Sequence, residues 1–349
     1  MTFSQPLGYL SAGTDFDGTL HASEKTLDYF AWVGCMPFLD TLLEKNRVVS
    51  YITTQLLRRP GGFNAVAATC VGRLIARYQD TDRQHHHVDQ PDYLDHFLEI
   101  KSADPTVSDG QIVSWIMANM AAGADTTAIT IRSALYYSLR TPGVWARLRA
   151  ELAAAGLSPP HPEKTPAVSY KQARCMPYLE AIIREAIRYL PGVSLGLERY
   201  VPAGGQRLPS PTTNHHPLAR ESVVPQGTIL AFNPWIINRN ESIWGPDAYD
   251  FRPERWLRGS TESEAEFAQR LRAMNDTDLS FGAGKRMCMG KHLGLIQAYK
   301  VVATLALCYD IELVEKEREW TVVNSWFPRQ KGLEVRMKRR EDGGAAVSL

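Results

Sequence analysis

The chain has 349 residues, of which 39 are lysine or arginine and 38 are aspartate or glutamate, and 44% are hydrophobic. This composition is that of a soluble globular protein and excludes disordered and collagen-like chains, and the net charge of +1 predicts no nucleic-acid partner. The five cysteines are scattered without a C-x-x-C pair, which argues against a disulfide framework and a zinc ribbon. No apolar run approaches the roughly 18 residues of a membrane-spanning helix, and the first residues do not resemble a signal peptide.

The first hundred residues predict helices separated by polar breaks, notably over 23–43 and 65–78. A polar joint is expected over 80–91. It contains three consecutive histidines, 85–87, which we interpret as part of a loop and not as a metal site.

A long helix is predicted over 108–140. Ser108 and Gln111 have the spacing of a capping box at its start. At 1.5 Å per residue, these roughly 32 residues make a rod of about 48 Å, which must cross a whole domain. A further helix is expected to begin at Thr141-Pro142.

The second half of the chain alternates between strong and weak periodicity. A helix with an apolar stripe is predicted from Pro177 to Pro191, and short strands split by glycine and proline over 193–235. The stretch 244–257 is rich in proline and aromatic residues and has no clear period.

The last strong helix is expected to begin near Cys288 and to end near Tyr309, followed by strands over 312–315 and 333–337. Helices dominate, and strands are few and late. The sequence therefore predicts a mainly α protein with small β-sheets, of the α+β class.

The segment 281–290 places a cysteine between glycines where a loop turns into a helix. Free N–H groups at a helix start favour the thiolate form of Cys288, and a thiolate is a natural axial ligand of haem iron. Arg286 is placed to bind a haem propionate and Phe281 to shield the sulfur from water. A single cysteine taken alone is more often a buried small hydrophobic residue.

The pattern of this segment resembles F-x-x-G-x-R-x-C-x-G, the haem-thiolate motif of the cytochrome P450 monooxygenases. It matches at every specified position. Those positions are Phe281, Gly284, Arg286, Cys288 and Gly290.

A second resemblance lies in the long helix, where Ala122-Gly-Ala-Asp-Thr-Thr127 is similar to the family's oxygen-binding motif. The resemblance implies that Thr126 supports proton delivery to iron-bound dioxygen, that Asp125 relays protons and that Gly123 leaves room for O₂. A threonine hydroxyl in a helix can also bond to a carbonyl one turn earlier. Taken alone, the segment reads more simply as a packed helix with a polar stripe.

A third resemblance involves Glu185 and Arg188, whose spacing is similar to the family's E-x-x-R motif. Arg255 in the segment 251–256 is their expected partner. In the family these side chains lock the core beside the cysteine loop, so we expect structural support from them and not catalysis. Taken alone, an i, i+3 pair of this kind is usually a solvated surface bridge. Arg199 resembles, more loosely, a position that often meets a propionate.

The resemblance extends over the whole chain but matches only the later two-thirds of a usual family member, of the fungal pisatin-demethylase or benzoate-hydroxylase type. We therefore expect one partial domain over 1–349 with the cytochrome P450 fold lacking its N-terminal third. It would contain the oxygen-binding helix (108–140) and the haem-thiolate loop with its following helix (281–309). The connection 205–224 is longer than usual, and Asn238 stands where relatives commonly have histidine.

The resemblance implies a haem-thiolate monooxygenase that inserts one oxygen atom from O₂ into a lipophilic small molecule, with electrons from an NADPH-dependent flavoprotein reductase. Fungal relatives often act in secondary metabolism. Intact relatives sit on the endoplasmic reticulum membrane through an N-terminal helix absent from this chain, which would place the chain at the cytoplasmic face or free of the membrane. Motif alignment suggests as substrate-facing positions Ala121, Ala122, Leu195, Leu197, Trp326 and Phe327.

Two alternatives stay open. A truncated remnant would bind haem without turnover or fold poorly. An isomerase or peroxygenase would work without a reductase, although Asp125 and Thr126 argue against it. Three other patterns are set aside. The segment 282–285 looks like the end of a phosphate loop but lacks the rest of that motif, and the two histidines 215–216 are interpreted as part of a loop and not as a metal site. The W-x-x-x-R motif of 145–149, which the family uses for a propionate, follows the oxygen-binding helix here instead of preceding it.

Overall fold

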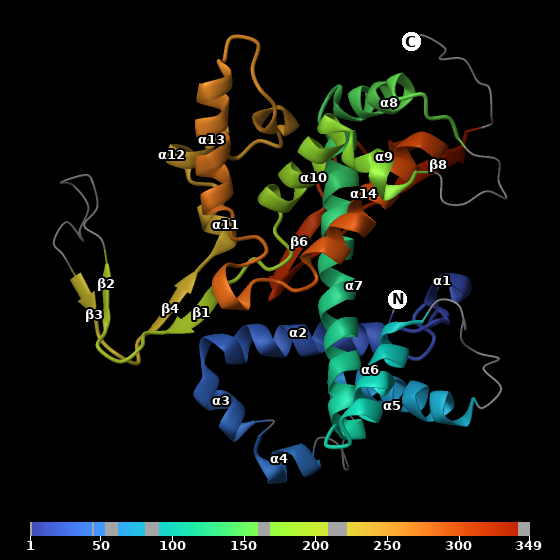
Figure 1. Cartoon of the computed structure of the whole chain (residues 1–349), viewed down its shortest axis with the longest axis vertical. Helices are drawn as coiled ribbons and strands as arrows, with labels where there is room; N and C mark the ends of the chain where they lie inside the picture. Colours follow the sequence, from blue (N-terminus) through green and yellow to red (C-terminus); the bar gives the residue numbers. More distant parts are fainter. Residues whose placement is uncertain are drawn as a thin grey trace. The chain divides into compact units, whose positions relative to one another are not determined.

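The computed structural model of the protein describes most of the chain (Figure 1). The described residues are 2–43, 45–52, 62–80, 91–159, 168–208 and 222–340. The histidines 85–87 and 215–216, most of the polar joint 80–91 and the central part of 205–224 lie outside these residues. Helices dominate the described residues and the strands are short, which confirms the predicted α+β class.

The chain divides into two compact units, and the division falls within the long helix α7 (Asp109–Arg140). Unit 1 comprises Met1–Thr126 and Ser325–Phe327, and unit 2 comprises Thr127–Asn324 and Pro328–Leu349. Ser108 and Gln111 form the capping box at the start of α7: the Gln111 N–H donates to Ser108 Oγ at 3.3 Å and the Ser108 N–H to Gln111 Oε1 at 2.8 Å.

Unit 1 consists of helices that precede the middle of α7. These are α1 (Tyr9–Ala12), α2 (Thr19–Cys35), α3 (Pro37–Leu42), α4 (Arg47–Tyr51), α5 (Gly62–Gln79) and α6 (Tyr93–Ala103). The single helix expected over 23–43 is wrong, because Pro37 has no N–H to continue α2 and instead opens α3. The core includes the buried side chains Phe3, Val66, Cys70, Leu74, Leu94, Ile112 and Ile116.

A charged cluster closes the start of α6 in unit 1. Asp92 is 4% exposed, caps the helix by accepting from the Asp95 N–H, and receives Arg77 Nη2 at 2.7 Å and Ser4 Oγ at 2.8 Å. Arg77 also pairs with Asp95. Burial alone raises the pKa of Asp92, but Arg77 and the other donors outweigh it and lower the pKa from 3.8 to about 2.

The stability of the protein should therefore fall in acid through Asp92. The pKa of Asp92 is lower in the folded than in the unfolded state, so its contribution to stability is complete above about pH 4 and is lost as the pH falls towards 2. This contribution amounts to about 2 kcal/mol, of which about 1 kcal/mol is lost by pH 3. Urea unfolding at pH 6 and pH 3, followed by circular dichroism, measures it against Asp92→Asn. An equal acid loss in both proteins would contradict the assignment.

Unit 2 contains the second half of α7 and the later elements of the chain. Its helices are α8 (Val144–Ala154), α9 (Tyr170–Arg174), α10 (Pro177–Tyr189), α11 (Pro234–Ile237), α12 (Glu241–Trp244), α13 (Glu264–Thr277) and α14 (Lys291–Cys308), with the 3₁₀ turns η2 (Pro253–Trp256) and η3 (Gly284–Arg286). The helix expected at Thr141-Pro142 begins two residues later, because Gly143 takes a left-handed φ of +80° at its N-cap.

The strands of unit 2 form small antiparallel pairs. β1 (Leu197–Tyr200) pairs with β4 (Ile229–Phe232), β2 (Gln206–Leu208) with β3 (Ser222–Val224), and β5 (Tyr309–Leu313) with β8 (Val335–Arg339). β6 (Thr321–Ser325) lies beside β7 (Phe327–Lys331) in a further two-stranded sheet, whose turn belongs to unit 1. The long connection 205–224 therefore begins and ends as the paired strands β2 and β3.

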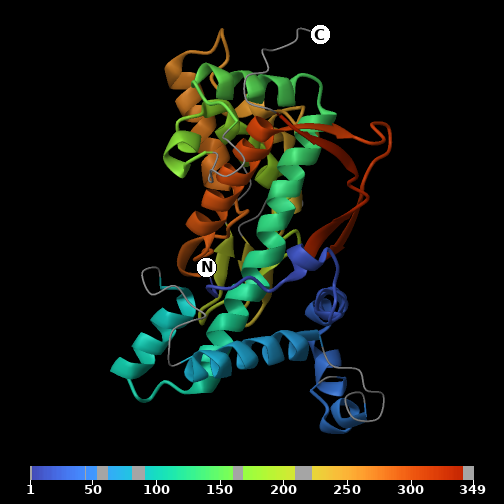
Figure 2. The ribbon, with the colours of Figure 1, turned by 90° about the vertical axis from the view of Figure 1, so that its right-hand side faces the viewer.

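The core of unit 2 forms where α10, α14 and α8 pack together. Leu179, Ile182, Ile183 and Ala186 of α10 are fully buried, as expected from the apolar stripe of this helix. Both views show α14 alongside the second half of α7 (Figures 1 and 2). Among the described helices, none is long and apolar enough to cross a membrane.

Candidate functional site

Cys288 lies on an exposed loop that leads into α14. Its backbone N–H donates to the Phe281 carbonyl at 2.8 Å, which closes the loop, and its own carbonyl accepts from the Lys291 N–H at 3.4 Å. The helix begins at Lys291 and not at Cys288 as expected, so the cysteine precedes the first turn. The thiol is exposed, and the next residue, Met289, is 99% exposed.

Two glycines give the loop its shape. Gly282 and Gly284 have φ of +69° and +63°, a left-handed conformation that other residues adopt with strain. Gly290 is close to the thiol, because a Cβ built on it would lie 3.8 Å from Cys288 Sγ. The loop therefore holds the sulfur in the open, with little side-chain bulk beside it.

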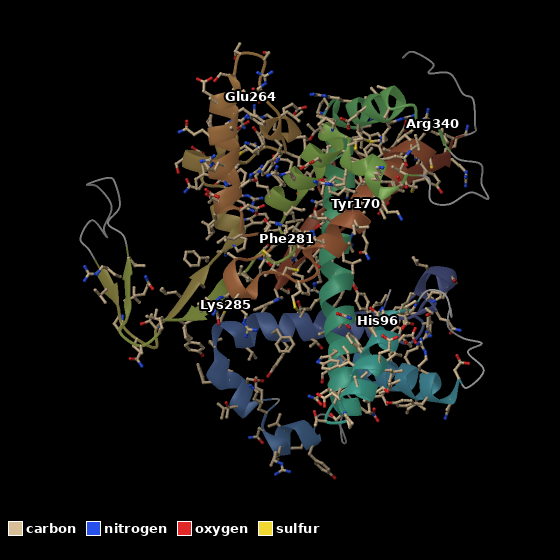
Figure 3. All side chains as sticks on the ribbon, viewed as in Figure 1. His96, Tyr170, Glu264, Phe281, Lys285 and Arg340 are labelled. Atoms are coloured by element: carbon tan, nitrogen blue, oxygen red, sulfur yellow. The ribbon has the colours of Figure 1, made fainter. Side chains whose placement is uncertain are left out.

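The side chains around the loop differ in exposure. Phe281 is partly buried and packs against the core of unit 2, with Lys291 Nζ 5.4 Å from its ring centroid. Arg286 and Lys285 are exposed, and Figure 3 labels Phe281 and Lys285 on this loop. Basic side chains are thus available on the open side of the loop for the carboxylates of a ligand.

The donor set at Cys288 fits a haem. The described residues contain no group of three or more histidine, cysteine, aspartate or glutamate side chains that could hold a metal ion. A haem needs a single thiolate from the protein, and Cys288 offers one exposed sulfur. The exposed sulfur, the small Gly290 and the basic side chains suit such a group.

Glu185 and Arg188 of α10 form a fully buried cluster of charges with Arg255 of η2. Arg188 donates to the two Glu185 oxygens from Nη2 at 2.7 Å and Nε at 2.9 Å, and Arg255 Nε donates to Glu185 Oε1 at 2.9 Å. Glu185 and Arg188 are 0% exposed and Arg255 is 2% exposed. The structure thus brings together the three residues that the sequence pattern joined.

Further donors and acceptors satisfy this cluster. Trp256 Nε1 donates to Glu185 Oε2 at 2.9 Å, a contact that the sequence did not suggest although Trp256 is adjacent to Arg255. Arg188 also donates to the carbonyls of Asn238, Ala248 and Asp250. A buried charge is stable only when paired and hydrogen-bonded, so the cluster is a rigid structural element.

Side chains distant in the sequence complete both ends of α10. At its start, Glu151 accepts from the N–H groups of Tyr178 and Leu179 at 2.7 and 2.9 Å. At its end, Arg239 Nη2 donates to the Tyr189 carbonyl at 2.7 Å, and the same guanidinium lies 3.4 Å from the ring centroid of Trp235. Burial lowers the pKa of Arg239 to about 10.

Two more side chains connect the end of α10 to the cysteine loop. Asn238 Nδ2 donates to the Arg188 carbonyl and to Ser280 Oγ, both at 3.1 Å, and Ser280 Oγ donates to the Ile187 carbonyl at 3.4 Å. Ser280 directly precedes Phe281, the residue that accepts from the Cys288 N–H. Sequence reasoning missed this connection, although it singled out Asn238 as unusual.

Asp125 and Thr126 lie on the part of α7 that belongs to unit 1. Both are partly buried, and Thr126 Oγ donates to the Ala122 carbonyl at 2.7 Å, the bond to the preceding turn that was expected. The next residue, Thr127, belongs to unit 2, where its Oγ1 lies 3.6 Å from a Cβ built on Gly294 of α14. Within unit 2, α7 thus meets α14 one turn after the cysteine loop.

Two other residues singled out in the sequence have distinct positions. Arg199 is exposed on β1, and its Nη1 donates to the Glu198 carbonyl at 2.6 Å. Trp326, in the turn between β6 and β7, has a φ of +71°, the one positive value of a non-glycine residue in the described part of the chain. Such strain in a bulky residue often marks a functional position. In unit 1 its ring lies 3.8 Å from a Cβ built on Gly34.

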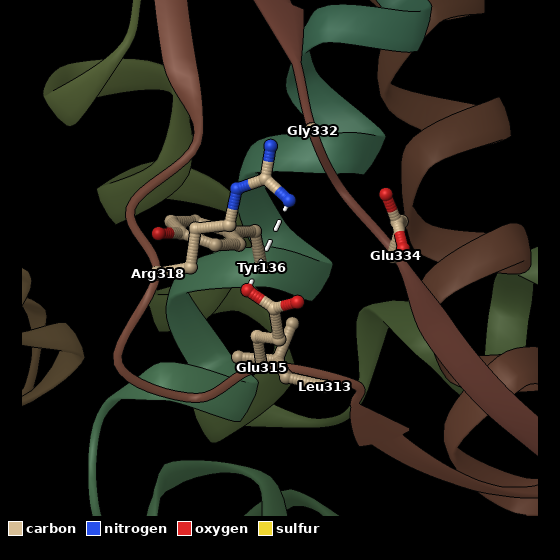
Figure 4. Close-up of a pocket in the computed structure, with 6 residues that line it drawn as sticks. All are labelled: Tyr136, Leu313, Glu315, Arg318, Gly332 and Glu334. Carbon is tan, nitrogen blue, oxygen red and sulfur yellow. Dashed lines mark ion pairs between the residues drawn. The ribbon is translucent and has the colours of Figure 1, made fainter.

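A small pocket in unit 2 is separate from the cysteine loop 281–290. Its lining residues are Tyr136, Leu313, Glu315, Arg318, Gly332 and Glu334 (Figure 4). Glu315 and Arg318 form an ion pair at 3.8 Å there. The W-x-x-x-R motif set aside above is also structural, because Arg149 pairs with Asp310 at 2.9 Å and Trp145 is buried.

Comparison with known proteins gives matches over the whole chain. The family model described as Cytochrome P450 matches residues 23–333. Cytochrome P450 monooxygenase cfoH of Aspergillus candidus is 42% identical over 349 residues, which are all of this chain and 60% of that protein. Cytochrome P450 monooxygenase vrtE of Penicillium aethiopicum is 33% identical over 348 residues, 99% of this chain and 63% of that protein.

A solved structure also matches. The crystal structure of a cytochrome P450, CYP102L1, has a TM-score of 0.60 and 24% sequence identity, and the match covers 80% of this chain and 56% of that one. This similarity shows the fold. The chain spans about three fifths of the length of the two monooxygenases named above.

Proposed function

Because the chain belongs to the cytochrome P450 family, whose cofactor is a thiolate-ligated haem, we propose that it forms the haem-binding part of a monooxygenase. This enzyme inserts one oxygen atom from O₂ into a lipophilic small molecule, in fungal secondary metabolism. One observation supports the proposal: an exposed cysteine precedes α14 on a two-glycine loop, and Asn238 connects Arg188 of the buried Glu185, Arg188 and Arg255 cluster to Ser280 at the start of that loop.

In this proposal the cysteine loop binds and orients the cofactor. Cys288 would hold the haem iron through its thiolate, and Arg286 and Arg199 would pair with the haem propionates. Phe281, already packed on the core of unit 2, would shield the sulfur from water in the haem-bound protein. Gly284 and Gly290 leave space for a flat ligand at the loop. When bound, the haem supplies the activation of dioxygen.

Asp125 and Thr126 are proposed to move protons. The Thr126 hydroxyl donates to the Ala122 carbonyl, and this bond fixes the position of the hydroxyl oxygen. The Thr126 oxygen then serves as the acceptor for a proton donor on the exposed side of the motif. Asp125 is proposed to relay protons from solvent. These roles rest on the family motif and on this hydrogen bond.

The proposal has a direct test in the ultraviolet-visible spectrum. The chain is expressed with haem supplied, reduced with dithionite and exposed to CO. A red-shifted Soret band in the difference spectrum, typical of thiolate ligation, supports the proposal. Absence of haem uptake would overturn it and leave a non-catalytic remnant.

Thr126→Ala should uncouple oxygen consumption from product formation. Loss of a positioned proton-transfer group typically lowers the rate about 100-fold or more, so product formed per O₂ consumed should fall while peroxide release rises. Oxygen-electrode and peroxide assays, with a reductase and a substrate found by screening, measure this ratio.

The matched control is Thr277→Ala in α13, because Thr277 Oγ makes the same bond to a carbonyl four residues earlier, at 2.8 Å. This variant should stay fully coupled. Unchanged coupling in Thr126→Ala would show that Thr126 delivers no proton.

The electron donor and the location follow from the same proposal. An NADPH-dependent flavoprotein reductase supplies two electrons, and the protein works at the cytoplasmic face of the endoplasmic reticulum or free of the membrane. The strained backbone of Trp326 supports a substrate-facing role for its turn. The proposed substrate-facing residues are Ala121, Ala122, Leu195, Leu197, Trp326 and Phe327.

A further inference from the structure

We infer that Asn238 is a positioning residue, which fixes the Cys288 loop to the end of α10; its importance for thiolate ligation rests on the proposed function. Asn238 is fully buried and lies 50 residues from Cys288 in the sequence. It touches neither the thiol nor the bound cofactor in this proposal. It acts through Ser280.

The end of α10 creates the need for such a residue. The last four carbonyls of a helix have no partner within it. Here the Leu190 N–H donates to the Ala186 carbonyl, and Ser280, Asn238 and Arg239 donate to the next three. Three of these four carbonyls thus depend on side chains that come from elsewhere in the chain.

Asn238 has the chemistry to join two segments. Its amide nitrogen carries two hydrogens, and the structure uses one for the Arg188 carbonyl and the other for Ser280 Oγ. The connection to α10 is reciprocal, because Arg188 Nη1 donates to the backbone carbonyl of Asn238 at 2.7 Å. A neutral histidine at this position carries one N–H and could not serve both acceptors.

The amide oxygen of Asn238 takes no part in these contacts. Asn238 Oδ1 is buried and has no hydrogen-bond partner within the described residues. Such an unsatisfied oxygen costs about 1–3 kcal/mol. A residue kept at this cost, with both amide hydrogens directed at the helix end and the loop, fits a positioning role.

From Asn238 the chain of contacts reaches the cysteine in three steps, the first of which is the bond from Asn238 to Ser280. Ser280 is covalently joined to Phe281, and the Phe281 carbonyl accepts from the Cys288 N–H at 2.8 Å. The Ser280 N–H is itself held by Asp278 Oδ1 at 2.9 Å. Removal of the Asn238 amide therefore weakens the connection between the loop and α10, which is then made by the Ser280 bond to the Ile187 carbonyl, but leaves the internal closure of the loop intact.

Hydrogen exchange followed by mass spectrometry tests this inference without any cofactor. In Asn238→Ala, amides of the loop 279–290 should exchange about five- to tenfold faster, the effect of one lost hydrogen bond, while those of α8 keep their rate. Ser280→Ala removes the same bond from its other side and also the Ser280 bond to the Ile187 carbonyl, so it should accelerate exchange of the loop at least as much. Ser280→Thr keeps the hydroxyl and should exchange as the unmodified chain does.

Asn240→Ala is the matched control. Asn240 lies two residues away and uses its amide oxygen only to cap α12, accepting from Ser242 in its own segment. This change should leave the loop 279–290 unaffected. Wild-type exchange of the loop in both Asn238→Ala and Ser280→Ala would overturn the inference.

The reduced CO spectrum then tests the role in ligation. In haem-loaded Asn238→Ala and Ser280→Ala, part of the thiolate-type band should convert to a band typical of a lost thiolate, whereas Asn240→Ala keeps it whole. An unaltered band in both loop variants would overturn positioning for ligation. Failure of the unmodified chain to take up haem would overturn the proposed function, and the exchange result would still decide whether Asn238 anchors the loop.

Discussion

Cys288→Ser should eliminate the thiolate-type CO band and lower monooxygenation to background. A serine hydroxyl is not ionised at neutral pH and is a poor ligand for ferrous iron, whereas a thiolate donates the charge that favours O–O cleavage. The loop geometry should survive, because the Cys288 N–H bond to the Phe281 carbonyl is made by the backbone. Reduced CO difference spectra and product analysis measure the loss.

Cys175→Ser is the control for this change. Cys175 is the other cysteine of unit 2 that is exposed in the described structure, so an indirect effect of removing a surface thiol would appear there too. The control should keep the full band. A thiolate-type band in Cys288→Ser would assign the ligand to another residue.

Glu185→Gln should lower the free energy of unfolding by about 3–5 kcal/mol, the usual cost of removing one partner from a buried ion pair. Glutamine has the same shape, but its amide hydrogens would face the donors of Arg188, Arg255 and Trp256, and two buried cations would lose their carboxylate. Denaturant unfolding followed by far-ultraviolet circular dichroism measures the difference.

Glu180→Gln, on the same helix, provides the comparison. Glu180 is partly exposed and pairs with Arg174 at 3.6 Å, so its loss should cost less than about 1 kcal/mol. Similar losses in the two variants would mean that the buried cluster contributes no more than a surface pair.

Local patterns in the sequence predicted the long helices well. The cap residues Ser108 and Gln111 defined the start of α7, and the apolar stripe of α10 identified its buried face. α13 was missed because its sequence is polar and weakly periodic, although Ser263 and Glu266 form a capping box that indicates its start. The last strands are displaced by two or three residues, because the pairing of Tyr309 with Arg339 sets their register.

The candidate site, too, could be predicted only in part from the sequence. The cysteine loop could be read locally, because its glycines and cysteine lie within ten residues. The partners of α10 could not, since Asn238, Arg239 and Ser280 lie 50 to 93 residues from the carbonyls they bind. One sequence holds no information on which distant side chains meet a helix end.

The ends of α10 have a consequence for how the protein is synthesised. Arg255 follows Glu185 by 70 residues, and Ser280 follows Ile187 by 93. A nascent chain that has reached only α10 has Arg188 as the one cationic partner of Glu185 in that helix, and it leaves carbonyls at the helix end uncapped at a face that must be buried. Unit 2 should therefore acquire its native packing late in translation, in one cooperative step once the cysteine loop has left the ribosome.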